Sequence, residues 1–269
     1  YCRIIPQKMK NNALKLLFAL FLVGPLSSIK GQEVHRIDPP NWWLNYPLDT
    51  VEVFLIGEGL SEVTIDHFKG AERLEWGILS DNVAWVQFRI LPNLSSKEIT
   101  FKIGRRSIKY PLLERSGYEP KGLSDQDLIY LITPDRFHNG NPKNDDIKGM
   151  RERGTNRNES YARHGGDLKG IENGLGHIES LGATAIWINP LLENDMARDS
   201  YHGYAITDHY QIDPRYGGNE ELVALSNQMH ERGLKHVADI VYNHWGSSHY
   251  LQELMPDSSM VHWNQNGSI

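Results

Sequence analysis

Cysteine is almost absent from this chain. The only cysteine is Cys2, and it precedes the first methionine, Met9. A chain without cysteine after Met9 has no disulfide framework and no cysteine to which a lipid anchor could be attached. Its stability must come from an apolar core, and 269 residues with 39% apolar side chains are enough for one to two domains.

An excess of positive charge is also absent. The chain has 28 Lys and Arg against 34 Asp and Glu, a net charge of −6, whereas a nucleic-acid surface needs clustered Lys and Arg. The motifs His-Glu-x-x-His, Gly-x-x-x-x-Gly-Lys and Gly-x-Ser-x-Gly are missing too. These absences argue against a nucleic-acid partner, a zinc protease, a phosphate-binding loop and a serine hydrolase of that type.

The apolar run near the amino terminus is too short to span a bilayer. Residues 16–23 are eight apolar residues that follow Lys10 and Lys15 and precede Gly24, Pro25 and the pair Ser27-Ser28. A membrane span needs about 20 apolar residues, whereas a basic start, a short apolar run and small residues are typical of a signal peptide. We predict a signal peptide over 9–32, rather than a buried core helix, and a periplasmic or secreted location in a bacterium.

Residues 33–117 alternate between apolar and polar positions. Val86, Phe88 and Ile90 form one alternating series, and further series at 51–56 and 99–103 are separated from it by turn residues. Short alternating strands at this spacing predict an immunoglobulin-like β-sandwich domain. Residues 117–124, with Pro120 and Gly122, read as a linker.

The pattern changes after residue 125. Apolar strands are predicted at 128–132, 185–188 and 236–241, and helices that end at Gly182 and Gly233 separate them. This βαβ order fits a barrel or a doubly wound sheet, and the long polar loops favour the barrel. We predict that 118–269 is the first part of a truncated (β/α)8 TIM barrel of about three strands, because a complete barrel takes eight strands and roughly 250 residues. Such a piece made alone should expose its interior and aggregate.

Six short motifs follow one another in the second half of the chain. They are Ile-Thr-Pro-Asp-Arg-Phe at 132–137, Gly-Gly-Asp-Leu-Lys-Gly at 165–170, Ile-Asn-Pro at 188–190, Tyr-His-Gly-Tyr at 201–204, Asp-Pro-Arg-Tyr-Gly at 213–217 and Ala-Asp-Ile-Val-Tyr-Asn-His at 238–244. This ordered set resembles the α-amylase family of glycoside hydrolases, especially neopullulanases and cyclomaltodextrinases, including those of starch-utilisation systems. The resemblance implies hydrolysis of α-glucosidic bonds in starch-type glucans, pullulan or cyclodextrins by a retaining mechanism.

Three side chains are the candidates for binding a sugar. If residues 202–204 are extended, His202 and Tyr204 face the same way and offer an imidazole and a phenol to one ligand. Each histidine alone could equally be a hydrogen-bonded structural residue. The resemblance implies that His202, Tyr204 and His244 line the subsite of the sugar whose bond breaks, and that Asp239, predicted inside a strand, is structural and orients an arginine of the next strand.

An oxygen-rich loop at 139–146 is the candidate metal site. Its Asn, Asp, Gly and Pro residues are common in turns, but their oxygens are also the ligands that calcium prefers. The resemblance implies a Ca²⁺ ion held by Asn139, Asn141, Asn144, Asp145, Gly165 through its carbonyl, and Asp167. Asn141 stands where relatives often have aspartate.

No catalytic residue is nominated. The resemblance implies catalytic carboxylates at the ends of the fourth and fifth barrel strands, beyond Ile269, so this piece alone should be inactive. It also implies that Trp42-Trp43 begins a leading domain, where we interpret the pair as packing rather than sugar contact. Two alternative functions stay open: a glucan transferase of the same family, and a non-catalytic glycan-binding protein on an amylase scaffold. A homodimer of the full-length protein is also possible.

Overall fold

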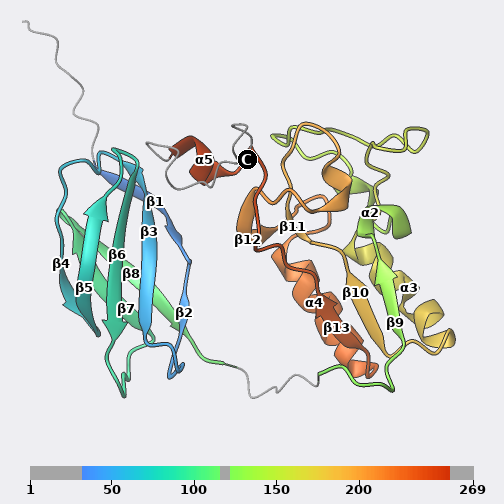
Figure 1. The fold of residues 1–269 in the computed structure, drawn as a ribbon, viewed down its shortest axis with the longest axis horizontal. Coiled ribbons are helices and arrows are strands. Elements are labelled where there is room, and N and C mark those ends of the chain that lie inside the picture. The colour runs from blue at the N-terminus through green and yellow to red at the C-terminus, as the bar shows by residue number, and fades with distance from the viewer. Residues whose placement is uncertain (1–31, 116–121, 255–269) are drawn as a thin grey trace, which may run out of the picture.

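The computed structural model describes residues 32–115 and 122–254, which form two units (Figure 1). The first unit contains only strands, and the second contains strands and helices. The signal peptide predicted at 9–32 lies almost entirely outside the described residues, and so does most of the predicted linker.

The first unit consists of two four-stranded sheets. One has the order β1 (Glu33–Asp38), β3 (Thr50–Glu58), β6 (Val83–Ile90) and β5 (Ala71–Ile78), all antiparallel. The other has the order β2 (Trp42–Trp43), β8 (Arg106–Leu113), β7 (Glu98–Ile103) and β4 (Ile65–Lys69), and only the β2–β8 pair is parallel. The two-layered part of the sandwich prediction agrees with this arrangement, while its immunoglobulin-like topology stays a prediction.

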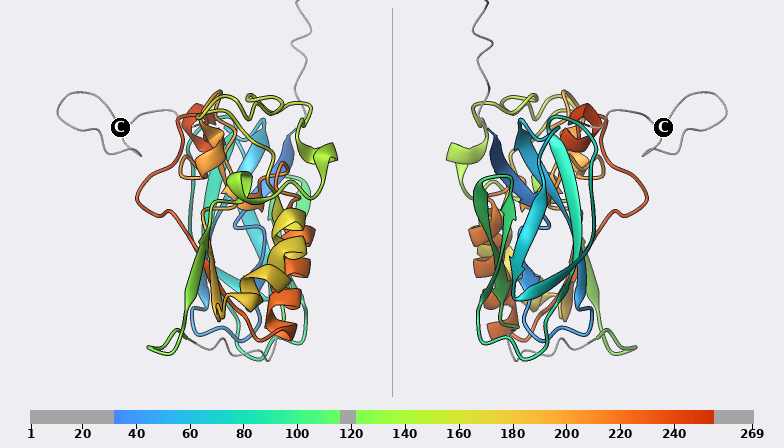
Figure 2. Two further views of the ribbon diagram at one scale, coloured as in Figure 1. Left: turned by 90° about the vertical axis from the view of Figure 1, so that its right-hand side faces the viewer. Right: turned by 90° about the vertical axis from the view of Figure 1, so that its left-hand side faces the viewer.

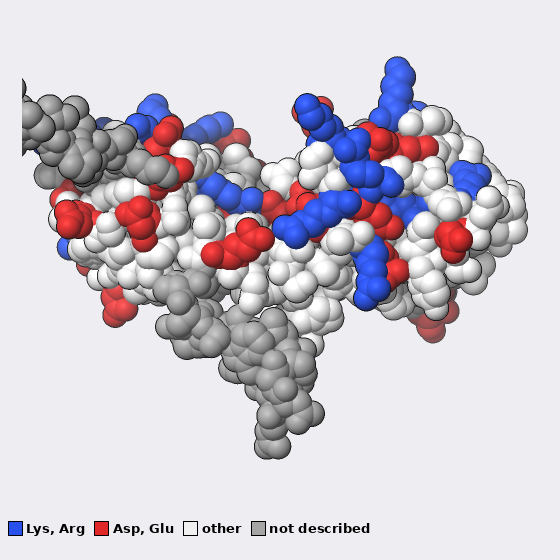
Figure 3. Space-filling model, turned by 90° about the horizontal axis from the view of Figure 1, so that it is seen from above, with Lys and Arg blue, Asp and Glu red and all other residues white. Residues whose placement is uncertain are grey.

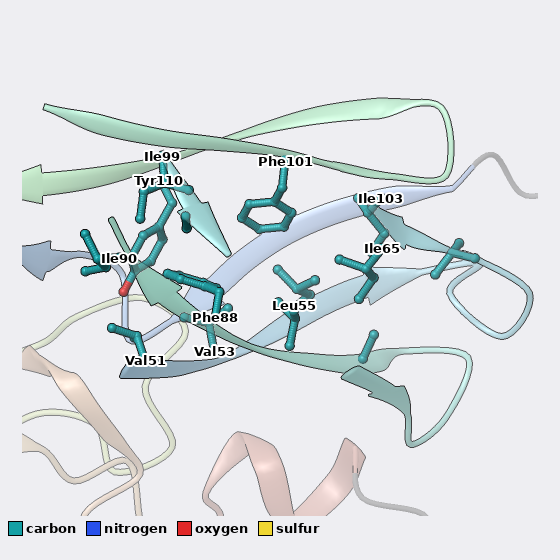
Figure 4. Close-up of a cluster of buried hydrophobic side chains, with 14 of the residues drawn as sticks. Val51, Val53, Leu55, Ile65, Phe88, Ile90, Ile99, Phe101, Ile103 and Tyr110 are labelled. Atoms are coloured by element: carbon teal, nitrogen blue, oxygen red, sulfur yellow. The ribbon is translucent and has the colours of Figure 1, made fainter. Parts of the chain in front are cut away.

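Alternate residues of both sheets face a shared apolar core (Figure 4). Aromatic rings fill its middle: Phe88 meets Tyr110 edge to face at 5.6 Å between ring centroids, and Phe68 stacks on Phe101 at 4.9 Å. Contacts of this kind add to the burial of the rings. The period of two in the sequence thus corresponds to the inward and outward faces of real strands.

Trp42 and Trp43 have different environments. Trp42 packs against the core of the first unit, and its Nε1 donates a hydrogen bond to the carbonyl oxygen of Leu48 at 2.8 Å. Trp43 is 37% exposed. The packing interpretation therefore holds for Trp42, whereas Trp43 lies at the surface.

The second unit is built on a parallel sheet of three strands. Its order is β13 (Lys235–Ala238), β10 (Ala185–Ile188) and β9 (Ile129–Ile132), with all three ending at the same level. Helices α3 (Leu168–Ser180) and α4 (Asn219–Glu231) cover one face of this sheet (Figure 2). The predicted βαβ order is thus observed, as an open sheet in the residues that the structure describes.

The opposite face of this sheet is bare. Leu131 is 59% exposed and Trp187 is 40% exposed, although both lie on central positions of strands. The prediction that 128–132 is a buried strand is therefore wrong for Leu128, Ile129 and Leu131, which are exposed, and holds for Ile132, on the face against α3 and α4. Exposed apolar residues on the other face are what an unclosed barrel would leave.

The third strand is shorter than predicted. It ends at Ala238, so Ile240 and Tyr242 lie outside it and are 42% and 89% exposed. The reason is its neighbour: Ala238 pairs with Ile188, the last residue of β10, and in the part of the chain that the structure describes no strand pairs with the residues beyond that point. Asp239 therefore follows the strand instead of lying inside it.

Short elements fill the loops above the sheet. They are α2 (Pro134–Phe137), the 3-10 helices η1 (Pro142–Asn144) and η2 (Ser200–His202), the hairpin of β11 (Leu192–Glu193) and β12 (Asp208–Ile212), and α5 (Tyr250–Leu254). Seen from above, basic and acidic side chains lie interspersed over these loops (Figure 3). No helix among the described residues is long and apolar enough to cross a membrane.

The two units meet near α5, which lies between them in Figure 1. Arg36 of β1 donates two hydrogen bonds to the carboxylate of Asp208 on β12, at 2.6 and 2.8 Å. The hydroxyl of Tyr250 in α5 donates to Asp38. Asp38 and Asp208 are both buried, whereas the Arg36 side chain is partly exposed, so the junction shields its two carboxylates from water.

Candidate functional site

The carboxyl ends of the three parallel strands form one rim. Thr133, Asn189 and Asp239 directly follow β9, β10 and β13. Asn189 Nδ2 donates to Thr133 Oγ1 at 3.1 Å, and Trp187 Nε1 donates to Asp239 Oδ2 at 3.1 Å. The loops that leave this rim carry the candidate binding residues, as expected when parallel strands share one carboxyl edge.

The three predicted sugar-binding residues lie together on this rim. The rings of His202 and Tyr204 are stacked, with 6.0 Å between centroids and 27° between planes. His244 Nε2 lies 3.1 Å from the carbonyl oxygen of Tyr204, a hydrogen bond that the ring donates through this nitrogen. The structure thus brings the two imidazoles and the phenol into one group.

The route to this arrangement differs from the prediction. Residues 200–202 form a 3-10 helix, and Gly203 has φ of +81°, so 202–204 is a tight turn and not an extended segment. A Cβ at Gly203 would lie 2.1 Å from the carbonyl oxygen of Pro190. The turn therefore needs glycine both for its backbone conformation and for this close approach.

Asp239 connects the rim to the phenol. Its Oδ2 accepts hydrogen bonds from the hydroxyl of Tyr204 at 2.9 Å and from Trp187 Nε1. Burial, reinforced by the contact with Asp239, raises the pKa of Tyr204, and burial lowers the pKa of His202. Both rings are therefore uncharged at neutral pH, which suits a neutral ligand with an apolar face and hydroxyl groups.

Four of the six predicted calcium ligands lie close together. Asn139 Nδ2 donates to both carboxylate oxygens of Asp145, at 2.8 and 3.0 Å. A Cβ on Gly165 would lie 2.7 Å from each of these two side chains, so the Gly165 backbone lies against them. Asn139 Oδ1 and the whole side-chain amide of the neighbouring Asn144 are buried without a hydrogen-bond partner.

The other two predicted ligands already serve backbone groups. Asn141 Oδ1 accepts from the backbone N–H of Lys143 at 3.3 Å. Asp167 caps α3: its carboxylate accepts from the N–H groups of Gly140, Asn141 and Gly170 at 3.1, 2.8 and 2.6 Å. Both residues thus have local roles that sequence reasoning did not assign to them.

The residues present fit a calcium ion. Amide and carboxylate oxygens are the ligands that calcium takes, and buried amide oxygens without partners are rare in folded proteins. Burial raises the pKa of Asp145, because the charged carboxylate is disfavoured away from water. A bound cation would offset this cost of keeping the carboxylate charged. The described residues contain no cluster of three or more His, Cys, Asp or Glu side chains that could hold a metal.

Sequence reasoning missed the buried charges behind the rim. Asp213 and Arg215 form an ion pair at 2.7 Å whose side chains are wholly buried. Arg215 also donates to the carbonyl oxygens of Asn194 and Glu152, and so joins three loops. The Asp-Pro-Arg-Tyr-Gly motif marked the position of this pair, but nothing in the local sequence marked its partners.

Comparison with known proteins places the second unit in a described family. Residues 131–264 match the family described as α-amylase, catalytic domain. Neopullulanase 2 of Thermoactinomyces vulgaris is 36% identical over 125 residues, 46% of this chain and 20% of its own length. The periplasmic α-amylase of Escherichia coli K12 is 32% identical over 148 residues, 50% of this chain and 22% of its own.

This chain therefore spans less than a quarter of each of these two relatives. Among solved structures, an α-amylase of Anoxybacillus aligns with 52% of this chain and 28% of its own, at 35% identity and a TM-score of 0.45.

Proposed function

Given that residues 131–264 belong to the α-amylase family of glycoside hydrolases, we propose that the full-length protein hydrolyses α-glucosidic bonds in starch-type glucans, pullulan or cyclodextrins. The observation that carries this proposal is the group formed by His202, Tyr204 and His244 at the rim of the parallel sheet. Two uncharged rings that stack beside a hydrogen-bonding imidazole offer an apolar surface and polar edges, and a glucose unit has both.

The chemistry that we propose is the retaining mechanism with two carboxylates. One carboxylate would attack the sugar and the other would act as acid and then base, at a separation of about 5–5.5 Å. The ring group would hold the sugar whose bond breaks, and none of the acids described so far is assigned to either catalytic role. We also propose that the three strands β9, β10 and β13 belong to an eight-stranded barrel in the full-length protein, behind an immunoglobulin-like leading domain.

Two further features belong to the proposal. A Ca²⁺ ion would be held by oxygens of Asn139, Asn144, Asp145 and Gly165, with Asn141 and Asp167 shaping the loop around it. We place the protein in the periplasm or outside the cell, supported by the signal-like sequence at 9–32 and by the relative named as a periplasmic α-amylase. A homodimer of the full-length protein remains a proposal from the resemblance alone.

Product analysis of the full-length protein tests the function. Incubation with soluble starch, pullulan and β-cyclodextrin should release short malto-oligosaccharides. Tyr204→Ala should raise KM and lower kcat/KM by tenfold or more, because it removes one of the stacked rings. Tyr161→Ala is the matched control, since Tyr161 is 71% exposed and lies outside the ring group.

The same assay separates the alternatives. Longer oligosaccharides made from a short donor would identify a transferase of the same family. Binding of starch without any product would identify a glycan-binding protein on this scaffold. If the full-length protein neither released products from these glucans nor bound them, the proposal would be overturned.

A further inference from the structure

The turn at 199–203, which carries His202, has a backbone that needs outside support. Asp199 has φ of +58° and Gly203 has φ of +81°, so two residues within five lie in the left-handed region. Residues other than glycine rarely adopt this conformation. Such a conformation persists where surrounding contacts hold it, and these sites are often functional.

Ser200 is the first anchor of this turn. Its backbone N–H donates to Glu152 Oε2 at 2.8 Å, and its hydroxyl oxygen accepts from Arg163 Nη1 at 3.3 Å. Ser200 and Arg163 are each 1% exposed. Both anchoring residues come from the loop at 139–167, distant in sequence from the turn.

Tyr201 is the second anchor. The guanidinium of Arg136 lies 3.9 Å from the centre of its ring, a cation–π contact, and its carbonyl oxygen accepts from the hydroxyl of Tyr216 at 2.9 Å. Arg136 is itself fixed by bonds to the carbonyl oxygens of Ala162 and Ser160, at 2.9 and 2.8 Å. The residue just before His202 is therefore held at its ring and at its backbone.

Arg163 connects these anchors to the loop that leaves β9. Its Nη2 lies 3.7 Å from Asp135 Oδ1, and its guanidinium lies 5.0 Å from the ring centre of Tyr216. Nη2 is buried and has no hydrogen-bond partner among the described residues. Burying a guanidinium with an unused donor costs free energy. If Arg163 only filled space, an apolar side chain could do so without that cost.

We propose that Arg163 is a positioning residue: by holding Ser200, and through Tyr216 the carbonyl of Tyr201, it fixes the turn that places His202 against Tyr204 for sugar binding. This inference rests on the proposed function of the ring group. None of residues 199–203 belongs to the buried core between the sheet and its helices, although Tyr216, which holds Tyr201, does. Without Arg163 the turn should relax, and the stacked rings should separate.

Kinetics of the full-length protein test the role of Arg163. Arg163→Met should raise KM for maltooligosaccharides by about tenfold or more, with a smaller change in kcat, because the rings bind the substrate in its ground state. Ser200→Ala and Tyr216→Phe should each raise KM by about threefold, since each removes one anchoring hydrogen bond. Arg157→Met is the control: its Nε donates to the carbonyl oxygen of His164 in the same loop and not to the turn.

NMR titration of His202 gives a readout that does not require activity. Burial lowers the pKa of His202, while Asp199 and Glu152 oppose this shift. When the turn relaxes in Arg163→Met, the ring gains water and its pKa should rise toward 6.5. In Arg157→Met the pKa should stay at its wild-type value.

The outcomes separate the two proposals. If the full-length protein has no hydrolytic activity but the His202 titration shifts as described, the proposed function fails and the positioning role stands. If folded Arg163→Met keeps both the wild-type KM and the wild-type titration, the positioning role is overturned. Should Arg163→Met fail to fold, unchanged KM and titration in both Ser200→Ala and Tyr216→Phe would overturn it equally.

Discussion

Two adjacent aspartates show how much the surroundings of a single residue decide. Asp145 faces Asn139 and Gly165 and is partly buried, whereas Asp146 is half exposed and pairs with Arg153. A calcium ion held by the loop would contact the first carboxylate and not the second. The pair therefore offers a matched test at one position in the chain.

Calcium should stabilise the full-length protein through Asp145. Anything that binds only the folded state stabilises it by about 2.7 kcal/mol at a hundred times its Kd, so removing calcium with EGTA should lower the melting temperature by several degrees. Asp145→Asn should abolish this calcium-dependent shift, and Asp146→Asn should retain it. Differential scanning fluorimetry with and without CaCl2 measures both. If the melting temperature of the wild-type protein were the same with and without calcium, the proposed calcium site would be wrong.

Within helix α3, two glycines have opposite surroundings. A Cβ on Gly170, in the first turn, would lie 1.7 Å from the carbonyl oxygen of His138, so the helix start presses against the loop that leaves β9. A Cβ on Gly176 would meet no atom within 4 Å. The first glycine is needed for packing, whereas the second only lowers the helix propensity.

Alanine should therefore have opposite effects at these two positions of α3. Gly170→Ala should destabilise the protein by more than about 1 kcal/mol, because backbone must move to admit the methyl group. Gly176→Ala should stabilise it by about 0.5–1 kcal/mol, through helix propensity and a less flexible unfolded chain. Urea denaturation of the two variants measures both changes. Equal effects at the two sites would show that the contact with His138 does not constrain the helix.

Elements defined by local signals were predictable from the sequence. Helices α3 and α4 end where Gly182 and Gly233 adopt φ of +81° and +76°, as their positions indicated. The end of β13 was not predictable, because it depends on the length of β10 beside it. The turn at 199–203 was missed for a similar reason: its anchors Arg163 and Glu152 are dozens of residues away.

The candidate site divides in the same way. The grouping of His202, Tyr204 and His244 followed from the family motifs and from the shared edge of parallel strands. The capping roles of Asn141 and Asp167 did not, because they depend on which backbone N–H groups the folded loop leaves without partners. Motifs located the site, and only the three-dimensional contacts assigned tasks within it.

At the scale of the whole molecule, a cluster of rings and charges joins the two units. Arg36 lies 4.0 Å from the ring centre of Tyr250 while its guanidinium bonds Asp208. His249 stacks between Trp245 and Tyr250, with centroids at 4.7 and 4.5 Å. Its Nε2 lies 3.1 Å from Nδ1 of His209, the neighbour of Asp208. The junction thus packs two histidines next to an arginine.

These histidines should make the junction sensitive to acid. Burial, together with the nearby His209 and Arg36, lowers the pKa of His249 to about 4. Burial also lowers the pKa of His209. The negative charge of Asp208 opposes both shifts. A histidine with a lowered pKa favours the docked state when neutral. Its contribution is complete above about 6.5, the pKa of a free histidine, and is lost as the pH falls toward 4. Protonation would also place a charge beside Arg36, which the nearby carboxylates Asp38 and Asp208 offset only in part.

We therefore expect the two units to separate between about pH 6.5 and 4 while each keeps its own fold. Small-angle X-ray scattering of the full-length protein should record a larger radius of gyration at low pH, with unchanged far-ultraviolet circular dichroism. His249→Gln should weaken this pH dependence, whereas His177→Gln, on the exposed side of α3, should leave it as it is. A radius that does not change with pH in the wild-type protein would contradict this expectation.

The junction also orders events during synthesis. Asp208, the partner of Arg36, is synthesised 172 residues after it, and Tyr250, the partner of Asp38, is synthesised 212 residues after it. By the time these partners leave the ribosome, every strand of the leading domain has been made, so this domain can fold first and then offer a finished surface. The second unit would thus dock onto a leading domain that is already folded, and the relative orientation of the two units would be fixed in the last step.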